Sequence, residues 1–449
     1  MRWFDFASFQ PVTFSVRRSI LSFATFFFLA SCTSGDRAVD PGADQSSPEL
    51  LSFEVLSENG QSFAMWEANE PVRAVLEYGQ SREELYRHSY SGSKEYKTSG
   101  MVKLVAVPEG TYAWTARLRD VAGNEIARTL PEQPTFTVAA AAQEELLFFA
   151  MIDVGWGDAL FLRAPDGKTT LIDCGLPIDG STVRRFLAHE GVTALDFASL
   201  THLHEDHIGG FYGDEEKRSD GVFRVFNAGA SVIPCRTFLD IRNKSFTIRH
   251  YRKLLSCIDG NPILGQHVLL EWGASSEFEP ALRWGDGLRV DLLSAGKKES
   301  IIPDFIQPAQ TGSAENNDSM VYRVQFRNFV LLLMGDAEFS TENFMMDHWP
   351  AEFLQSSVLK VGHHGAEDAS SEKFVSLVNP RAAFISNALS ENPGVEHASV
   401  MARFREQGAD FYASDRVMPN RQESGARGDV LLWTDGDAFT VVAVPTRFE

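Results

Sequence analysis

A cluster of metal-ligand side chains lies in the segment THLHEDHIGG, residues 201–210. His202 and His204 alternate, so they face the same way if the preceding strand continues, and Asp206 with His207 follows in a predicted loop. Neutral imidazole and carboxylate are good ligands for zinc, iron and manganese. Two histidines on one side and an Asp-His pair on the other therefore predict a site for two adjacent divalent cations.

Further candidate ligands follow apolar runs elsewhere in the chain. Asp173 lies in LIDCG, Asp336 in FVLLLMGDAE, and His363 with His364 in VLKVGHHG. An α/β protein places its chemistry at the carboxyl ends of buried strands, which is where these residues stand. Six of the eleven histidines fall in three short motifs, and a chance grouping of surface histidines explains this poorly.

Apolar runs separated by turn residues predict the elements that position these groups. Runs at 146–154 and 159–163 flank a Gly-Trp-Gly-Asp turn, and TTLIDCG is a third strand. A helical segment and the strand LDFASLT then lead into the histidines. Asp158, in the turn, is either a turn residue or a support for the site. The interval 211–315 contains a basic helical segment that we expect in the cleft wall, with its cations facing either solvent or an anionic substrate.

The H-x-H-x-D-H pattern, followed by Ile-Gly-Gly, resembles the signature of the metallo-β-lactamase fold. The resemblance implies an α/β domain of four αββα layers over residues 146–449. It also implies two divalent metal ions, zinc first, with manganese or iron as alternatives. The implied ligands are His202 and His204 for the first metal, Asp206, His207 and His364 for the second, and Asp336 bridging both.

The resemblance leaves the order of the two late histidines open. His364 is favoured as the ligand, and His363 as a phosphate contact or proton donor. Asp173 matches an acid that supports the ligands from behind. His397 resembles a late histidine that donates a proton to a leaving oxygen, although Ala398 replaces the proline that usually follows it. The alternative for His397 is a surface residue at the start of a helix.

The branch of this fold is indicated by a missing histidine. Lactamases, glyoxalases and lactonases carry a third histidine for the first metal, and here only His250 and His267 lie in that interval, in the wrong context. Asn317 and Ser319 in ENNDS, with DVGWGDA and VGHHG, instead resemble the hydrolase domain of the competence protein ComEC and the teichoic-acid phosphorylcholine esterase. This makes Asn317 a candidate catalytic residue and Ser319 a supporting one, against ordinary turn chemistry.

A phosphodiesterase is the function that these features favour. Two adjacent cations can activate water and stabilise the charge that builds on a phosphoryl group. The candidate catalytic residues are Asp206, His363, His397 and Asn317. Hydrolysis of a lactone or β-lactam, and a non-catalytic surface protein that keeps metal for stability, are the alternatives.

Charge limits the partners. The chain carries 61 acidic and 41 basic residues, a formal net charge of -20. Such a surface repels phosphates, so we expect no tight nucleic-acid binding. The predicted partner is a phosphodiester-containing substrate, because of the chemistry of the metal centre.

The N-terminal segment predicts export and anchoring. Two arginines precede an apolar run too short to span a bilayer, and LASC at 29–32 resembles a bacterial lipobox. This implies a signal peptide over 1–31, lipidation of Cys32 and a polar tether over 32–50, with a membrane anchor that merely ends in cysteine as the alternative. The predicted location is the cell envelope, on the outer membrane or periplasmic face, or else the extracytoplasmic surface.

Residues 51–138 predict a separate all-β unit. Short alternating stretches broken by proline and glycine indicate a small sandwich, whose core would contain the residues Trp66, Tyr78, Tyr112 and Trp114. The order of its motifs resembles an immunoglobulin or fibronectin type III domain, for which a spacer role is favoured over adhesion. Cys235 and Cys257, in the other domain, either pair in an oxidising compartment or stay free.

Overall fold

The computed structural model describes residues 45–445 apart from residues 59, 83, 139–143, 242–247, 297–313, 388–397 and 415–427. The predicted signal peptide, Cys32 and His397 lie outside the described residues. No helix in the described part of the chain is long and apolar enough to cross a membrane.

The first sheet of the site-bearing half begins with three antiparallel strands and continues with three parallel ones. Its first strand, LFFAM, is buried at every position because the sheet is covered on both faces, and a continuous apolar run suits such a strand. The strand–turn–strand–turn–strand order predicted from the sequence is confirmed. The strands are β8 (Leu147–Met151), β9 (Leu160–Arg163), β10 (Thr169–Ile172), β11 (Leu195–Ser199), β12 (Cys235–Ile241) and β13 (Leu264–Leu270).

The second sheet has six strands in the order of the chain. The first three pair antiparallel and the last three continue in parallel, so the carboxyl ends of four neighbouring strands meet at one edge. The strands are β14 (Leu288–Ser294), β15 (Val321–Phe326), β16 (Phe329–Leu333), β17 (Val358–Lys360), β18 (Ala382–Ile385) and β19 (Asp410–Ala413).

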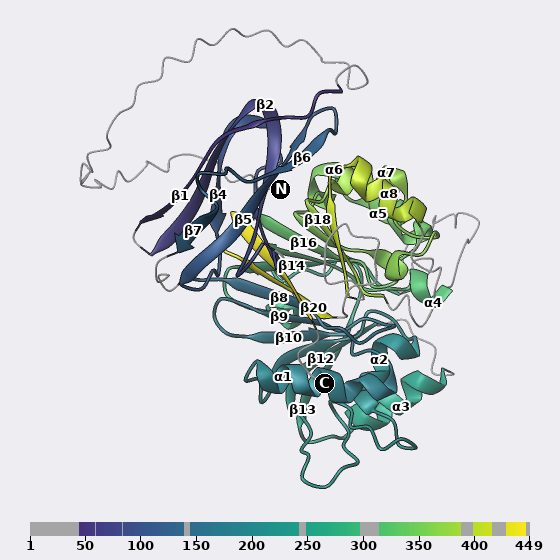
Figure 1. The fold of residues 1–449 in the computed structure, drawn as a ribbon. Helices are drawn as coiled ribbons and strands as arrows, with labels where there is room; N and C mark the ends of the chain where they lie inside the picture. Colours follow the sequence, from purple (N-terminus) through teal and green to yellow (C-terminus); the bar gives the residue numbers. More distant parts are fainter. Residues whose placement is uncertain are drawn as a thin grey trace, which may run out of the picture. The chain divides into compact units, whose positions relative to one another are not determined.

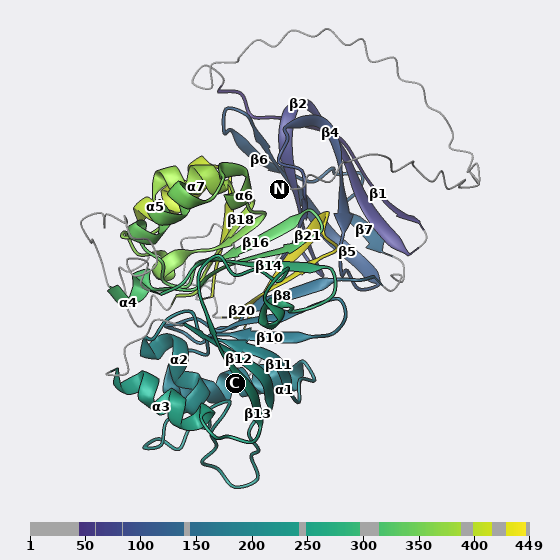
Figure 2. The ribbon, with the colours of Figure 1, turned by 180° about the vertical axis from the view of Figure 1, so that it is seen from behind.

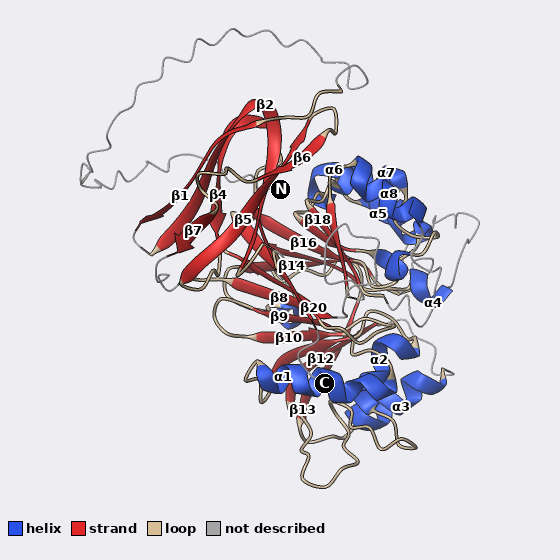
Figure 3. Ribbon diagram, viewed as in Figure 1, coloured by secondary structure: helices blue, strands red, loops and turns tan. Residues whose placement is uncertain are grey.

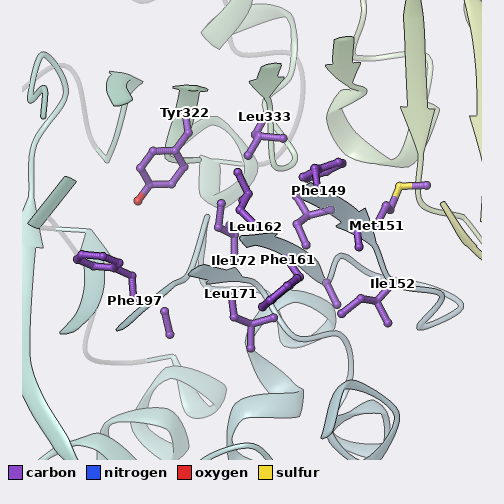
Figure 4. Close-up of a cluster of buried hydrophobic side chains, with 14 of the residues drawn as sticks. Phe149, Met151, Ile152, Phe161, Leu162, Leu171, Ile172, Phe197, Tyr322 and Leu333 are labelled. Atoms are coloured by element: carbon purple, nitrogen blue, oxygen red, sulfur yellow. The ribbon is translucent and has the colours of Figure 1, made fainter. Parts of the chain in front are cut away.

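The two sheets pack face to face through a shared apolar core (Figure 4). Phe149 of the first sheet stacks on Phe384 of the second, with ring centroids 5.9 Å apart. Ser199 Oγ and Tyr322 Oη, 2.8 Å apart, form a hydrogen bond across the same interface. Because the core lies between the sheets, the ends of strands from both sheets are held against one another.

Helices cover the outer faces of both sheets, which gives the αββα layers (Figures 1 and 3). Helices α1 (Gly180–His189), α2 (Glu205–Tyr212) and α3 (Arg249–Ile258) lie on the first sheet. Segments α1 and α3 coincide with predicted helices, whereas α2 lies where a loop was expected. A second core packs the other set against the outer face of the six-stranded sheet. That set is α5 (Phe339–His348), α6 (Ala351–Leu354), α7 (Glu372–Val378) and α8 (Ala398–Glu406), and the short α4 (Ala314–Asn317) precedes β15.

An additional β-rich region precedes this fold and shares a sheet with it. Strand β3 (Arg87–Ser91) pairs with β21 (Ala438–Pro445), which itself pairs through β20 (Gly428–Thr434) with β8 (Figure 2). Tyr90 of β3 stacks on Phe439 of β21 with ring centroids 4.6 Å apart. The other strands are β1 (Leu50–Glu58), β2 (Gln61–Gly79), β4 (Lys97–Leu104), β5 (Gly110–Asp120), β6 (Glu125–Arg128) and β7 (Thr135–Val138).

The aromatic residues predicted for the core of this region are buried. Trp66, Tyr78, Tyr112 and Trp114 belong to one cluster, with Trp114 and Tyr78 fully enclosed. The immunoglobulin or fibronectin assignment of the region stays a prediction. In the other half, Cys235 and Cys257 are buried free thiols. The two cysteines therefore do not form a disulfide in this structure.

Candidate metal centre

The predicted ligands converge at the carboxyl ends of strands from both sheets. Asp173 follows β10, His202 follows β11, and Asp336 follows β16. His363 and His364 follow β17 in a short 3₁₀ turn, Gly362–Gly365. The face-to-face packing of the sheets thus brings together residues up to about 190 positions apart in the sequence, between 173 and 364.

Asp206 and His207 differ from expectation in their local structure. The sequence predicted a loop, but both residues lie in the first turn of α2, which begins at Glu205. Two glycines permit this arrangement. A Cβ on Gly157 would lie 2.1 Å from the carbonyl oxygen of Asp206, and one on Gly210 would lie 1.9 Å from that of Cys174. The helix therefore packs backbone to backbone against the neighbouring loops.

One group of ligand atoms gathers around Asp336 and α2. His207 Nε2 lies 3.1 Å from Asp336 Oδ2 and 4.0 Å from Asp206 Oδ2. His364 Nε2 lies 3.4 Å from Asp336 Oδ1 and 3.6 Å from Asp206 Oδ2. The four residues thus offer ligand atoms within 4.8 Å of one another, a spacing that a single cation can bridge.

A second group shares the same aspartate. His202, His204 and Asp336 also offer ligand atoms within 4.8 Å of one another, and His202 Nε2 lies 3.7 Å from Asp336 Oδ2. Asp336 therefore belongs to both groups. This is the arrangement that a bridging carboxylate requires.

The donor atoms fit metal ions because they are buried and unsatisfied. Among the described residues, the Nε2 atoms of His202, His207 and His364 and the Oδ1 atom of Asp336 have no hydrogen-bond partner. All four side chains are at most 2% exposed. Buried polar atoms normally have partners, since leaving one unpaired costs about 1–3 kcal/mol. Cations held by the two groups would satisfy all of them.

Asp173 contacts the ring nitrogen of His207 that faces away from Asp336. Its Oδ2 lies 2.8 Å from His207 Nδ1, so the ring presents Nε2 to the centre. Thr201 donates to the same carboxylate from its backbone N at 2.7 Å and from its Oγ1 at 2.6 Å. Metal-binding histidines are commonly fixed in this way by a carboxylate on the other ring nitrogen.

His364 is fixed by a different set of partners. Its Nδ1 lies 3.0 Å from the backbone carbonyl oxygen of Ser386 and 3.4 Å from Asp158 Oδ1. Asp158 is fully buried and forms an ion pair with Lys360, whose Nζ lies 2.6 Å from Oδ2. The ring of Trp156 lies 4.8 Å from that of His364. Asp158 is therefore more than a turn residue in this structure.

His363 is held apart from His364 in a group of its own. Its Nδ1 lies 2.7 Å from Asp368 Oδ1 and 3.7 Å from Glu338 Oε1. Its side chain is 24% exposed, whereas His364 is fully buried. Both histidines have positive φ angles, 44° and 53°, in the left-handed region that few non-glycine residues adopt. The left-handed turn aims the two neighbouring rings in different directions.

Asn317 and Ser319 lie beside the centre without entering either ligand group. The Asn317 amide donates to Glu338 Oε2 at 2.7 Å, and its Oδ1 accepts from the backbone N of Thr341 at 3.2 Å. Ser319 Oγ accepts from the backbone N of Asp336 at 3.2 Å. Ser319 thus contacts the bridging residue, and Asn317 ties α4 to the start of α5.

The pKa of the histidines shifts in opposite directions in the two ligand groups. Burial lowers the pKa of His202 and His204, which keeps both imidazoles neutral, the form that binds metal. Burial acts in the same sense on His207 and His364, but the carboxylate of Asp336 and its neighbours raise the pKa of both well above the ordinary value. The carboxylates around His207 and His364 therefore favour positive charge at this position, which a metal ion would also supply once both rings are deprotonated.

Sequence reasoning missed the supporting residues Thr201, Glu338, Lys360, Asp368 and Ser386. None of them stands in a metal-ligand pattern. Only Glu338 and Asp368 could have been suspected, because they end the motifs MGDAE and GHHGAED, which contain predicted ligands. Glu205, which the motif alone makes a spacer, contacts His250 (Oε1 to Nδ1, 2.7 Å). His267 pairs with Asp240 at 2.8 Å. Among the described residues, neither histidine joins a ligand group, so the first group has two histidines.

Comparison with known proteins agrees with this geometry. Residues 152–219 match the model of the metallo-beta-lactamase superfamily. The chain is 26% identical over 268 residues to ComE operon protein 3 of Bacillus subtilis (strain 168), covering 56% of this chain and 30% of the relative. It is 28% identical over 264 residues to competence protein ComA of Neisseria gonorrhoeae, covering 59% and 30%. The chain thus spans about 30% of the length of these relatives.

Among solved structures, a diphosphatase of the PhnP family aligns at 13% identity with a TM-score of 0.28, covering 53% of this chain and 85% of that one. A long-form RNase Z from yeast aligns at 12% identity and a TM-score of 0.29, covering 55% and 38%. The chain carries a metallo-beta-lactamase superfamily domain related to ComE operon protein 3 and ComA. Its buried His and Asp clusters suggest a metal-dependent hydrolase.

Proposed function

We propose that the protein is a phosphodiesterase with two divalent metal ions, acting at the cell envelope. The observation that carries the proposal is the sharing of Asp336 between a group with two histidines and a group with Asp206, His207 and His364. Two cations at such a centre would act as Lewis acids that activate water and stabilise charge on a phosphoryl group. Zinc is the first candidate, with manganese or iron next.

The residues around the centre have different proposed roles, according to where they lie. Asp173 holds His207, and Ser386 with Asp158 holds His364, so both rings present Nε2 to one point. His363 is partly exposed beside the centre and held by Asp368, which suits contact with a phosphate oxygen. We assign His363 this role, because its left-handed backbone keeps the ring out of the ligand group.

The small number of histidines in the first group supports a phosphodiester over a lactone or β-lactam. Neither His250 nor His267 supplies a third ligand, since each is paired with a carboxylate elsewhere. The first metal would then keep room for a substrate oxygen, as catalytic sites do.

The test is hydrolysis of bis-p-nitrophenyl phosphate by the mature protein loaded with zinc or manganese, with metal counted by mass spectrometry. We expect turnover and two metal ions per chain in the wild type. Asp336→Ala should lose both metals and at least about 100-fold in rate, because it removes a ligand from both groups. Asp286→Ala, at a side chain that is 89% exposed, is the control. Turnover of nitrocefin or a lactone panel in place of the phosphodiester would overturn the proposal.

We propose further that Cys32 anchors the protein to the envelope through lipid. The lipobox-like LASC supports this, and the polar residues that follow Cys32 in the sequence would link the lipid to the domain. Labelled palmitate should enter the wild type and not Cys32→Ala, and the variant should leave the membrane fraction. Equal labelling of both would contradict the anchor.

A further inference from the structure

Several arginines gather where the β-rich region meets the second sheet. Two hollows open here, of about 90 and 10 Å³, and both are lined by Arg73 of β2 and by Arg381, which precedes β18. Arg119 of β5 also lines the smaller one. Because a cavity of roughly 10–15 Å³ holds one water, the larger hollow has room for several waters or for a small polyatomic ion.

The hollows lie at the opposite end of β18 from the metal centre. Arg381 directly precedes this strand, whereas Ser386, which contacts the ligand His364, directly follows it. A strand rises about 3.3 Å per residue, so Arg381 and Ser386 stand about 17 Å apart. The arginines are therefore separate from both ligand groups.

Two cations join the β-rich region to the site-bearing half through backbone carbonyl groups. Arg381 donates from Nη1 to the carbonyl oxygens of Ser91 at 3.2 Å and Ser93 at 2.6 Å. Lys94 reaches in the other direction and donates from Nζ to the carbonyl oxygen of Ser356 at 2.9 Å. Carbonyl oxygens accept hydrogen bonds but carry no net charge. Both cations are thus held in place without being neutralised.

Cations outnumber acids in this basic cluster. Its six members line the hollows or contact a lining arginine: Arg73, Lys94, Lys97, Arg117, Arg119 and Arg381. Four carboxylates form ion pairs with them, of which Glu95 pairs with Lys97 at 2.8 Å. The other three all pair with Arg117, and they belong to Glu77, Glu125 and Asp410. Among the described residues, the cluster thus holds two positive charges in excess.

Three arginines of the cluster have no carboxylate partner. Within the described part of the chain, Arg73, Arg119 and Arg381 form no ion pair. Arg73 and Arg119 stand directly opposite one another on the antiparallel strands β2 and β5. Like charges in this position repel each other, which destabilises a sheet. The chain thus keeps a like-charge pair whose repulsion a bound anion would relieve.

Burial adds to the cost of this charge. Arg381 is 4% exposed, and burial, followed by the charge of Arg73, lowers the pKa of its guanidinium to about 10. Burial, with the charges of Arg73 and Arg381, likewise lowers the pKa of Lys94 to about 8. Buried charges in proteins are normally paired, because removing them from water is unfavourable. An anion would therefore stabilise these cations.

The three arginines also keep hydrogen-bond donors for a ligand. Arg73 donates only from Nε, to the carbonyl oxygen of Lys94 at 2.7 Å. Among the described residues, its Nη atoms and the Nε of Arg381 donate to no other group, and Arg119 donates no hydrogen bond. Guanidinium groups bind phosphate and carboxylate oxygens through paired N–H donors. The excess of two charges favours a phosphate dianion over a carboxylate.

We infer that the basic cluster binds a phosphate group, either as free inorganic phosphate or as the terminal phosphate of a larger molecule. This site is separate from the metals and is independent of the proposed function. A phosphate held by Arg73 of the β-rich region and by Arg381 of the other half would stabilise the contact between them.

Calorimetric titration of the purified protein with inorganic phosphate and with glycerol phosphate, at constant ionic strength, tests this. Because phosphate can also bind at the metals, the titrations are repeated on chelator-treated protein. One phosphate site per chain should remain after chelation. Binding of glycerol phosphate assigns the terminal phosphate of a larger molecule, and binding of inorganic phosphate alone assigns the free ion.

The variant Arg73→Gln/Arg119→Gln should weaken phosphate binding at least about tenfold, because two charge-assisted contacts are removed. Arg119→Gln alone separates ligand binding from a structural role. Without phosphate its thermal midpoint should equal or exceed that of the wild type, since repulsion from Arg73 is relieved, and phosphate should raise it less. Arg128→Gln is the matched control with wild-type affinity, because Arg128 is an exposed cation of β6 that lines neither hollow.

The absence of a phosphate site after chelation would overturn the inference, as would equal affinity in the wild type and Arg73→Gln/Arg119→Gln. A lower thermal midpoint of Arg119→Gln in phosphate-free buffer, with an unchanged rise on adding phosphate, would show a purely structural role and overturn it too. Failure to hydrolyse bis-p-nitrophenyl phosphate bears only on the proposed function, because that reaction is measured at the metals.

Discussion

The Nδ1 atom of His207 lies 2.8 Å from Oδ2 of Asp173, and both side chains are fully buried. The contact fixes which nitrogen of His207 faces Asp336, where it lies 3.1 Å from Oδ2. Asp173 thus orients His207 without itself joining the ligand group around Asp336.

We predict that Asp173→Asn lowers metal affinity about 10- to 100-fold while the ligands stay in place, since a neutral amide supports the ring less well. Competition with a chromophoric chelator measures it. Asp240→Asn is the matched control, because Asp240 holds His267 by the same kind of contact, also 2.8 Å, outside both ligand groups. Equal affinity changes in the two variants would show a general loss of stability.

The two late histidines should behave differently. His364 lies in the group with Asp206, His207 and Asp336, and His363 does not. We expect His364→Ala to lose about one metal ion per chain, because its Nε2 has no other partner among the described residues. His363→Ala should keep both metals and lose rate on phosphodiesters. Metal counting by mass spectrometry distinguishes the two, and metal loss in His363→Ala alone would reverse the assignment.

The buried pair of Lys360 and Asp158 should be costly to break. Both side chains are fully buried and 2.6 Å apart, and Lys360 lowers the pKa of Asp158 against the effect of burial. Lys360→Met would leave a carboxylate buried without its cation, which costs about 3–5 kcal/mol of unfolding free energy. Denaturant titration of the metal-free protein measures this. The double variant Lys360→Met/Asp158→Asn should recover part of the loss, and no recovery would argue against the charge explanation.

Glu342 should make stability depend on pH. Burial raises its pKa from 4.5 to about 7, although Ser371 and Ser370 donate backbone hydrogen bonds to it. A raised folded-state pKa favours the protonated form in the native protein. Its contribution is therefore fully present below pH 4.5 and is lost as pH rises through about 7, by at most about 3 kcal/mol.

Glu342→Gln cannot ionise, so its unfolding free energy should change less between pH 5 and 8 than that of the wild type. We expect the variant to be less stable at low pH. The amide NH₂ of glutamine cannot accept a hydrogen bond, so it would face the backbone N–H donor of Ser370 or Ser371. Chemical denaturation across this range gives both curves. Parallel curves would show that another group carries the dependence.

The sequence determined the chemistry of the centre because the ligands stand in patterns set by local geometry. The spacing of His202, His204, Asp206 and His207 in one motif and the placing of Asp336 after an apolar run were enough to predict two groups of ligands. Strand and helix positions around them followed from apolar periodicity. Asp206 and His207 were wrongly expected in a loop, since eight residues with two glycines give a weak helical pattern.

Only the tertiary structure decided the contacts that depend on chain segments meeting in space. The left-handed turn at 363–364 separates His363 from His364, and no composition rule orders two adjacent histidines. Asp158 becomes a support for His364 because β17 carries Lys360 beside it. The contact between Glu205 and His250 arises from α2 packing on α3 across an interval of more than thirty residues. The sequence thus specifies which groups can bind metal, and the packing of two sheets specifies which neighbours orient them.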